Sequence, residues 1–274
     1  MPELPEVETI ARALHCGKNG ICPIVGKKVT KTHLLWERTL ANSTERKLKK
    51  HMIGQMIQSV GRRGKFVVIT LDQETLLIHL RMSGDLRVEL IGNSSLLKHD
   101  RFVLDFSDGF RLVFNDPRKF GRIWLTENPQ EILRGLGPEP LDFHLTTLQF
   151  HLMLKKRKRQ LKPLLLDQSF IAGLGNIYTD EALFLARLHP LKIASSMTEE
   201  QSKELLKTIR RVLREGIRRN GASIDWVYRG GDFQNHFHVY QRDGQRCLIC
   251  GGTIKRILVG QRGTHFCPHC QTLD

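Results

Sequence analysis

The sequence predicts an α+β protein: a β-sandwich with flanking helices, then a helical part, then a small cysteine-rich ribbon. Three observations predict this order. One amphipathic helical pattern opens the chain. From about residue 27 to 125 short apolar runs and apolar–polar alternation between turns indicate strands, many of them antiparallel. Beyond residue 140 apolar residues recur at helical spacing until paired cysteines end the chain. One helix, then many strands, then helices is typical of the α+β class.

The first helix is predicted over residues 5–14. Val7, Ile10 and Leu14 recur at helical spacing, and Pro5 suits a first helical turn. The clearest strands are residues 102–106 and 110–114, which alternate on either side of the turn Ser107-Asp108-Gly109 and therefore predict a hairpin. Residues 65–71 and 76–80 predict further buried strands.

Glycines and prolines mark a linker over residues 129–140. Helices are predicted at 145–154, from Leu164, at 180–187 and at 198–219. The last opens with Thr198-Glu199-Glu200-Gln201, a capping-box pattern. Short strands are expected from about Phe233. We therefore expect a catalytic β-sandwich domain at 1–128, a linker at 129–141, a helical domain at 142–232 and a ribbon at 233–274.

The charge balance indicates a polyanionic partner. The 274 residues contain 43 Lys and Arg against 28 Asp and Glu, giving a net charge of +15. Nucleic acid is the first candidate and an anionic membrane the second. No apolar run approaches the roughly 20 residues that span a bilayer, and the acidic start MPELPEVE is unlike a signal peptide. We expect a cytoplasmic protein with reduced thiols and no membrane partner.

Four cysteines form two pairs with metal-ligand spacing. Cys247 and Cys250 form one pair, and Cys267 and Cys270 the other, with residues 251–266 between them. Four thiolates complete a closed tetrahedral site, so we expect one structural Zn²⁺ in a C-terminal zinc ribbon. The alternative is four buried or oxidised cysteines. His265 and His269 are further candidate ligands, but four sulfurs suffice.

The N-terminus is unusual in its chemistry. Removal of Met1 leaves Pro2 with a secondary amine, a nucleophile that forms an iminium directly with an electrophilic sugar carbon. Glu3 and Glu6 are three residues apart and share a helical face near Pro2, where one can serve as general acid or base. Taken alone, the same residues also fit a capped helix start with surface carboxylates.

Seven strings in order resemble the formamidopyrimidine-DNA glycosylases from end to end. They are PELPEVET at 2–9, HLRMSG at 79–84, DPRKFG at 116–121, LGPEPL at 136–141, LLLDQ at 164–168, AGLGNIY at 172–178 and RGTHFCPHCQ at 262–271. Each string is short, but the ordered set covers essentially the whole chain. The resemblance implies a bacterial base-excision repair enzyme with DNA glycosylase and abasic-site lyase activities.

The resemblance implies roles for named residues. Pro2 attacks C1′ of the damaged nucleotide, and β- then δ-elimination from the Schiff base leaves a gap with phosphate ends. Glu3 resembles the proton donor, Glu6 lies close by, and Lys65 binds phosphate and carries a proton in elimination. Arg262, which also matches a residue that grips phosphate, completes the catalytic set.

The remaining matched residues bind DNA. His79, Asn176 and Tyr240, with Arg262, match residues that grip the phosphates beside the lesion, and Asn176 lies at the turn of the family's helix–two-turn–helix motif. Met82, Arg118 and Phe120 match side chains that fill the hole left by the extruded base. Extrusion costs a few kcal/mol, which an apolar wedge can offset. The implied partner is duplex DNA with oxidised purines (8-oxoguanine, formamidopyrimidines), bound by a monomer at the nucleoid.

The chain also departs from the family. Residues 223–235 are shorter than the usual loop over the extruded base, Gln241 replaces a glycine, and residues 16–23 form a small insertion expected at the surface.

Two other functions stay open. One is a non-catalytic zinc-ribbon DNA-binding protein, against which the Pro2-Glu3 start argues. The other is a glycosylase of the endonuclease VIII type, for oxidised pyrimidines. Such enzymes start PEGPE and lack the Met, Arg and Phe trio, so Leu4, Met82, Arg118 and Phe120 favour the purine branch.

Overall fold

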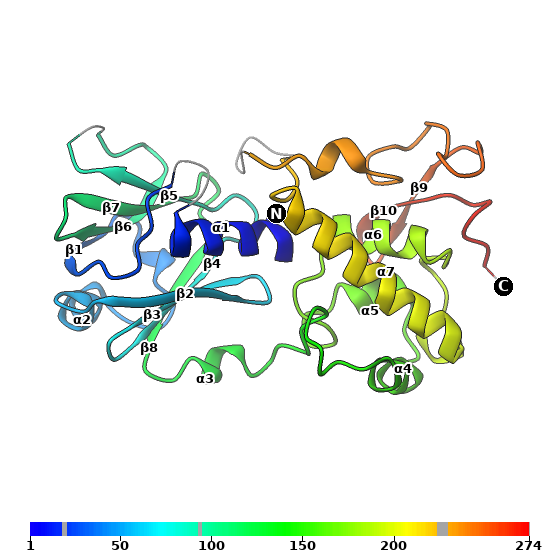
Figure 1. Cartoon of the computed structure of the whole chain (residues 1–274), viewed down its shortest axis with the longest axis horizontal. Helices are drawn as coiled ribbons and strands as arrows, with labels where there is room; N and C mark the ends of the chain where they lie inside the picture. The colour runs from blue at the N-terminus through cyan, green and yellow to red at the C-terminus, as the bar shows by residue number, and fades with distance from the viewer. Residues whose placement is uncertain (18–20, 93–94, 224–229, 274) are drawn as a thin grey trace. The chain divides into compact units, whose positions relative to one another are not determined.

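The computed structural model describes residues 1–17, 21–92, 95–223 and 230–273. The chain divides into two compact units. The first contains residues 1–134 and 222–231, and the second contains residues 135–221 and 232–274. Figure 1 shows the helices and strands of both units.

The first unit contains two four-stranded antiparallel sheets. One sheet has the order β1 (Val29–Leu34), β6 (Asp100–Phe106), β7 (Phe110–Asn115), β5 (Asp85–Leu90). The other has the order β2 (Ile57–Arg63), β3 (Phe66–Leu71), β4 (Thr75–His79), β8 (Arg122–Thr126). The predicted hairpin is confirmed as β6 and β7, which pair in register around Leu104 and Leu112.

Alternating apolar residues of both sheets make one core. Val67, Ile69 and Leu71 of β3 share this core with Phe102 and Leu104 of β6. Two helices flank the sandwich: α1 (Leu4–Cys16) packs against β2 and β3, and α2 (Glu45–Met52) packs against β1. The short helices η1 (Glu37–Thr39) and α3 (Gln130–Leu133) complete the unit. The predicted β-sandwich with flanking helices is confirmed.

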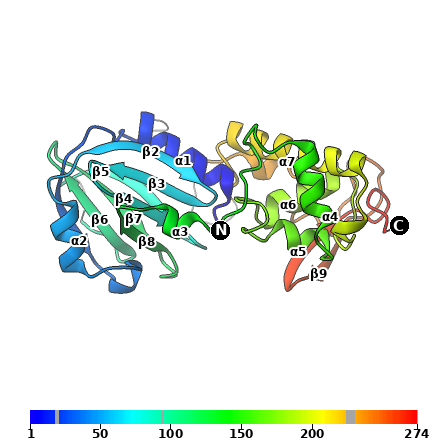
Figure 2. The ribbon, with the colours of Figure 1, turned by 90° about the horizontal axis from the view of Figure 1, so that it is seen from below.

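The second unit combines helices with a two-stranded ribbon (Figure 2). Its elements are α4 (Thr147–Lys155), α5 (Leu161–Leu165), α6 (Asn176–Leu185), η2 (Ala194–Ser196), α7 (Glu199–Arg218), η3 (Phe233–His236), β9 (Lys255–Val259) and β10 (Arg262–Phe266). The capping box at Thr198 and Gln201 is present as predicted. The sequence signal sufficed there because its partners are only three residues apart.

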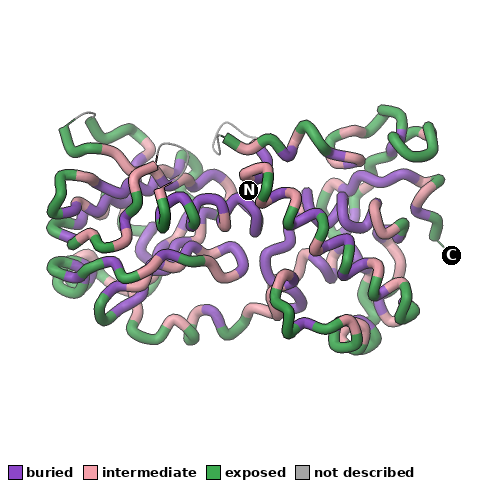
Figure 3. Tube along the Cα trace, in the orientation of Figure 1, coloured by how far each residue is buried: buried purple, intermediate pink, exposed green. Residues whose placement is uncertain are grey.

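Three local predictions differ from the structure. Helices α5 and α6 begin at Leu161 and Asn176, earlier than predicted. Residues 177–184 of α6 are all buried, which removes the polar face that a helical pattern needs (Figure 3). The expectation of strands from Phe233 is wrong for residues 233–236, because Asp232 accepts hydrogen bonds from Asn235 and stabilises a 3-10 turn.

Some expectations fall partly on residues outside the structure's description. Residues 224–229 of the loop predicted to be short are among them, as are residues 18–20 of the predicted insertion. Cys16 and Pro23, at the two ends of the predicted insertion, are exposed, and Ile21 and Cys22 within it are half-buried. Among the described residues, no helix is long and apolar enough to cross a membrane.

Candidate active site and nucleic-acid interface

The N-terminus of α1 is buried together with its two carboxylates. Pro2 is buried, and Glu3 and Glu6 are each only 2% exposed. Glu6 Oε2 accepts the backbone N–H of Glu3 at 2.8 Å, and Oε1 accepts that of Ala222 at 2.7 Å. Ala222 belongs to the same compact unit. Glu3 and Glu6 are therefore not surface carboxylates.

Lys65 and His79 lie in the same unit. Lys65 is 5% exposed, in the turn between β2 and β3. His79 ends β4, and its Nδ1 accepts the backbone N–H of Arg81 at 3.0 Å. Burial lowers the pKa of His79 to about 3, and the charges of Arg81 and Lys65 contribute. The ring is therefore neutral at pH 7, with its proton on Nε2, which can donate a hydrogen bond to an anion.

The loops that carry Met82, Arg118 and Phe120 are joined by one buried carboxylate. Asp116, 1% exposed, accepts hydrogen bonds from the Ser83 hydroxyl and from the backbone N–H groups of Arg118 (3.2 Å) and Gly121 (2.7 Å). Ser83 Oγ also lies 3.3 Å from the Arg118 nitrogen. The backbone on both sides of the three side chains is thereby fixed.

Two glycines bring these loops close together. A Cβ on Gly84 would lie 2.7 Å from the ring of Phe114, and one on Gly121 would lie 2.3 Å from it. Both glycines therefore permit the two loops to approach the buried ring of Phe114 closely. Phe120 remains 50% exposed, with the Arg118 guanidinium 5.3 Å from its ring centroid. An exposed aromatic side chain on a fixed loop is suited to contact a partner.

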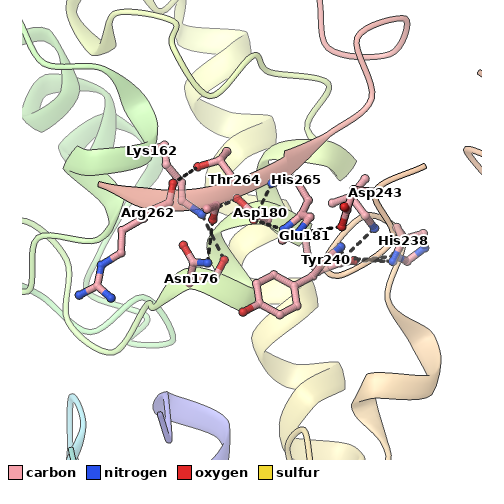
Figure 4. A network of polar contacts seen from close by, with 12 residues as sticks. Lys162, Asn176, Asp180, Glu181, His238, Tyr240, Asp243, Arg262, Thr264 and His265 are labelled. Atoms are coloured by element: carbon pink, nitrogen blue, oxygen red, sulfur yellow. Dashed lines mark hydrogen bonds and ion pairs between the residues drawn. The ribbon is translucent and has the colours of Figure 1, made fainter. Parts of the chain in front are cut away.

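In the second unit, α6 organises Asn176, Tyr240 and Arg262 (Figure 4). Asn176 is the first residue of α6, and its Nδ2 donates to the carbonyl of Gly263, next to Arg262, at 2.9 Å. Figure 4 shows all three side chains extending to the same side of the network. Backbone N–H groups at a helix start favour anions, and Arg262 adds a positive charge.

Adjacent buried carboxylates of α6 hold the surrounding segments. Asp180 pairs with the fully buried Lys162 and accepts the backbone N–H of His265 at 3.0 Å. Glu181 accepts the backbone N–H groups of residues 238–240, including that of Tyr240 at 2.9 Å. These contacts fix β10 and Tyr240 to one helix.

Sequence reasoning missed Asp116, Lys162, Asp180 and Glu181. The acidic pair inside the apolar string NIYTDEALFL of α6 is a signal for Asp180 and Glu181. Carboxylates are rarely fully buried unless they are paired.

The four predicted cysteines converge on one zinc site. Their Sγ atoms lie within 4.8 Å of one another, with 3.8 Å between Cys247 and Cys270 and 3.4 Å between Cys250 and Cys267. Four sulfurs at about 2.3 Å from one Zn²⁺ lie about 3.8 Å apart, so the residues fit the ion. His265 is held by Asp180 instead. Within the described ranges, no other cluster of His, Cys or carboxylate groups fits a metal.

Comparison with known proteins agrees with this architecture. Residues 1–123 match the formamidopyrimidine-DNA glycosylase N-terminal domain, residues 136–227 match the H2TH domain of the same enzymes, and residues 244–273 match the zinc finger found in FPG and IleRS. The formamidopyrimidine-DNA glycosylase of Chloroflexus aurantiacus is 44% identical over an alignment of 281 positions, which covers 99% of this chain and 98% of that protein.

Solved structures agree as well. Fpg (MutM) of Lactococcus lactis, in complex with Fapy-dG-containing DNA, is 36% identical with a TM-score of 0.90, over 99% of this chain and 100% of that one. MutM in complex with carbocyclic 8-oxo-G-containing DNA is 37% identical with a TM-score of 0.90, over the same shares.

The sandwich, the helical unit and its four-cysteine zinc site define a DNA-binding repair enzyme, a DNA glycosylase. More particularly, the chain belongs to the formamidopyrimidine-DNA glycosylase family, whose activity includes that of an abasic-site lyase.

Proposed function

We propose that this enzyme excises oxidised purines, 8-oxoguanine and formamidopyrimidines, from double-stranded DNA and then cleaves the strand itself. The buried Pro2-Glu3 start of α1 carries the proposal, because it combines a potential amine nucleophile with a carboxyl group. Relatives crystallised with Fapy-dG and 8-oxo-G DNA support the substrate class. We further propose a monomer that acts at the nucleoid in the bacterial cytoplasm.

Pro2 is the proposed nucleophile once Met1 has been removed. Its secondary amine attacks C1′, and the glycosidic bond breaks as the base leaves with its electron pair. Opening of the sugar gives an iminium, or Schiff base. Loss of a C2′ proton then breaks the C3′–O bond (β-elimination), and a second elimination breaks the C5′–O bond (δ-elimination). Both cuts leave phosphate ends, and hydrolysis of the remaining imine frees Pro2.

Glu3 and Lys65 are the proposed proton carriers. Glu3 protonates the opening sugar, and Lys65 binds a phosphate and moves a proton in the eliminations. Glu6 is proposed to position the catalytic residues, because both its oxygens accept backbone N–H groups, including that of Glu3. A carboxylate used in this way orients the start of α1 without taking up a proton.

The remaining site residues are proposed to bind and open the duplex. His79, Asn176, Tyr240 and Arg262 contact phosphates beside the lesion, His79 as a neutral Nε2–H donor and Arg262 as a cation. Arg262 also belongs to the proposed catalytic set, since the phosphate that it grips fixes the reacting nucleotide. Met82, Arg118 and Phe120 occupy the space of the extruded base. Zinc, when bound by the four cysteines, cross-links the ribbon that carries Arg262.

We propose that the chain is divided by function into a catalytic sandwich at 1–128, a linker at 129–141, a helix–two-turn–helix domain at 142–232 and a zinc ribbon at 233–274. The zinc ribbon and the helical domain pack within one compact unit, and both carry proposed phosphate contacts.

Excision on a panel of lesion duplexes tests the proposal. Matched duplexes carry 8-oxoguanine, a formamidopyrimidine, an oxidised pyrimidine or no lesion, and base release is measured in single turnover. We expect the two purine lesions to be released at least tenfold faster than the pyrimidine. Preference for the pyrimidine would favour the endonuclease VIII type, and binding without any release would favour a non-catalytic DNA-binding protein.

A further inference from the structure

A cavity of about 750 Å³ is lined only by residues of the second unit, and none of them belongs to the proposed catalytic or DNA-binding set. The C-terminal half of α7, the end of α6 and the chain around η3 form its walls. Leu185, Val212, Phe233 and Phe237 make its apolar surface. Its size is typical of ligand pockets in proteins.

The apolar surface continues onto the two residues between Cys247 and Cys250. Leu248, which lines the cavity, is 68% exposed, and its neighbour Ile249 is 52% exposed. Aliphatic side chains next to each other at this exposure, beside an apolar cavity, are typical of a protein-binding surface.

The side chains that line the cavity carry a net positive charge once the ion pairs among them are taken into account. Arg211, Arg214 and Arg218 lie on α7 at helical spacing. The Glu215 carboxylate pairs with Arg218 and Arg219, and these contacts lower its pKa to about 2. Glu181, the other acidic side chain of the cavity, accepts three backbone N–H groups.

Two guanidinium groups are therefore available to a partner. In the part of the chain that the structure describes, no ion pair or hydrogen bond joins the side chain of Arg211 or Arg214 to a carboxylate. Arginine binds carboxylates in a planar, bidentate geometry, which makes it a frequent anchor in interfaces.

We propose that this cavity binds an acidic segment of a partner protein, with an apolar anchor side chain in the cavity and carboxylates on Arg211 and Arg214. Single-stranded nucleic acid fits less well, because bases stack on exposed aromatic faces. Phe233 and Phe237 are only 4% and 7% exposed, and Phe237 already makes edge contacts with Phe233 and Tyr240. The inference goes beyond the proposed function and does not depend on the Pro2 chemistry.

Binding of a labelled probe peptide to the full-length, zinc-loaded enzyme tests the proposal. The probe has eight residues, six of them Asp or Glu, with one Leu and one Phe, and fluorescence anisotropy gives its Kd. The double variant Arg211→Glu/Arg214→Glu should weaken binding at least tenfold. The matched control Lys203→Glu/Lys207→Glu reverses two charges of the same helix outside the cavity lining and should bind the probe as wild type does.

Further arms separate the alternatives. Replacing the Leu and Phe of the probe by Ala should also weaken binding at least tenfold, and base excision by the cavity variant should stay at the wild-type rate. Equal weakening by both double variants would reveal nonspecific charge attraction and overturn the proposal. So would loss of probe binding in Arg262→Ala, which would place the probe on the DNA interface. A single-stranded oligonucleotide that loses affinity in the cavity variant, while the probe does not, would identify a nucleic-acid site instead.

Discussion

Glu6 accepts the backbone N–H of Ala222 at 2.7 Å, although 216 residues separate the two. Its second oxygen accepts the backbone N–H of Glu3 at 2.8 Å. One buried carboxylate thus joins the start of α1 to the chain that follows α7. The positions of Pro2 and Glu3 depend on a residue that the sequence alone presents as a candidate acid or base.

Glu6→Gln should therefore act mainly on stability. A side-chain amide offers one acceptor and one donor, so it leaves one of the two buried N–H groups without an acceptor, at a cost of about 1–3 kcal/mol. Denaturant unfolding measures the loss, with the exposed Glu45→Gln as control. A Glu6→Gln protein with wild-type stability and no base excision would show that Glu6 takes part in the chemistry directly.

The His79 ring should make the free energy of unfolding depend on pH. Its pKa is about 3 in the folded protein against an ordinary value of 6.5, so the unfolded chain binds a proton first as the pH falls. The contribution is complete above about pH 6.5 and is lost progressively towards pH 3. His79→Gln should flatten the fall in unfolding free energy within that window. The exposed His33→Gln should retain it, and an unchanged slope in His79→Gln would contradict the neutral ring.

Removal of a zinc ligand should unfold the ribbon and weaken binding to DNA. Metal binding and folding are coupled at a four-thiolate site, and the ribbon carries Arg262. We expect one zinc per chain in wild type, and in Cys250→Ser both loss of the metal and at least tenfold weaker binding to lesion duplex. The exposed Cys16→Ser should change neither. Full affinity of a metal-free Cys250→Ser would show that DNA binding does not need the zinc site.

Phe120→Ala should slow duplex opening and leave strand cleavage intact. An 8-oxoguanine:cytosine pair must be unstacked, whereas an abasic site has no base to extrude. Excision of 8-oxoguanine should fall by about ten- to a hundredfold, since each 1.4 kcal/mol is a factor of ten. Paired single-turnover assays on both substrates measure this, and Phe143→Ala, at an 81% exposed position, is the matched control. Equal losses on both substrates would indicate that Phe120 only supports the fold.

Local signals predicted much of the fold. The alternation of Phe102, Leu104 and Phe106 predicted a strand because alternate residues of a strand line one face, and all three lie in the core. The cap at Thr198 and the spacing of the cysteines also act over a few residues, so the sequence displays them directly.

Distant pairs could not be predicted in the same way. Asp180 accepts the backbone N–H of His265, which is 85 residues away, and the sequence around Asp180 does not indicate this partner. The start of α6 at Asn176 could not be predicted because residues 177–184 are all buried, so this part of the sequence lacks the polar face of a helical pattern. Sequence motifs identify the residues of the candidate site, but hydrogen bonds between residues far apart in the sequence hold them in position.

Borohydride trapping tests whether the Pro2 nitrogen forms the covalent link to DNA. Borohydride reduces an iminium to a stable amine, so wild type should give a covalent adduct on lesion-bearing duplex. Pro2→Gly retains a terminal amine and should trap more weakly. A protein with one uncleaved residue before Pro2 should give no adduct, because the nitrogen is then an amide. Full trapping by that extended protein would show that Pro2 is not the nucleophile and would assign the chemistry to a lysine.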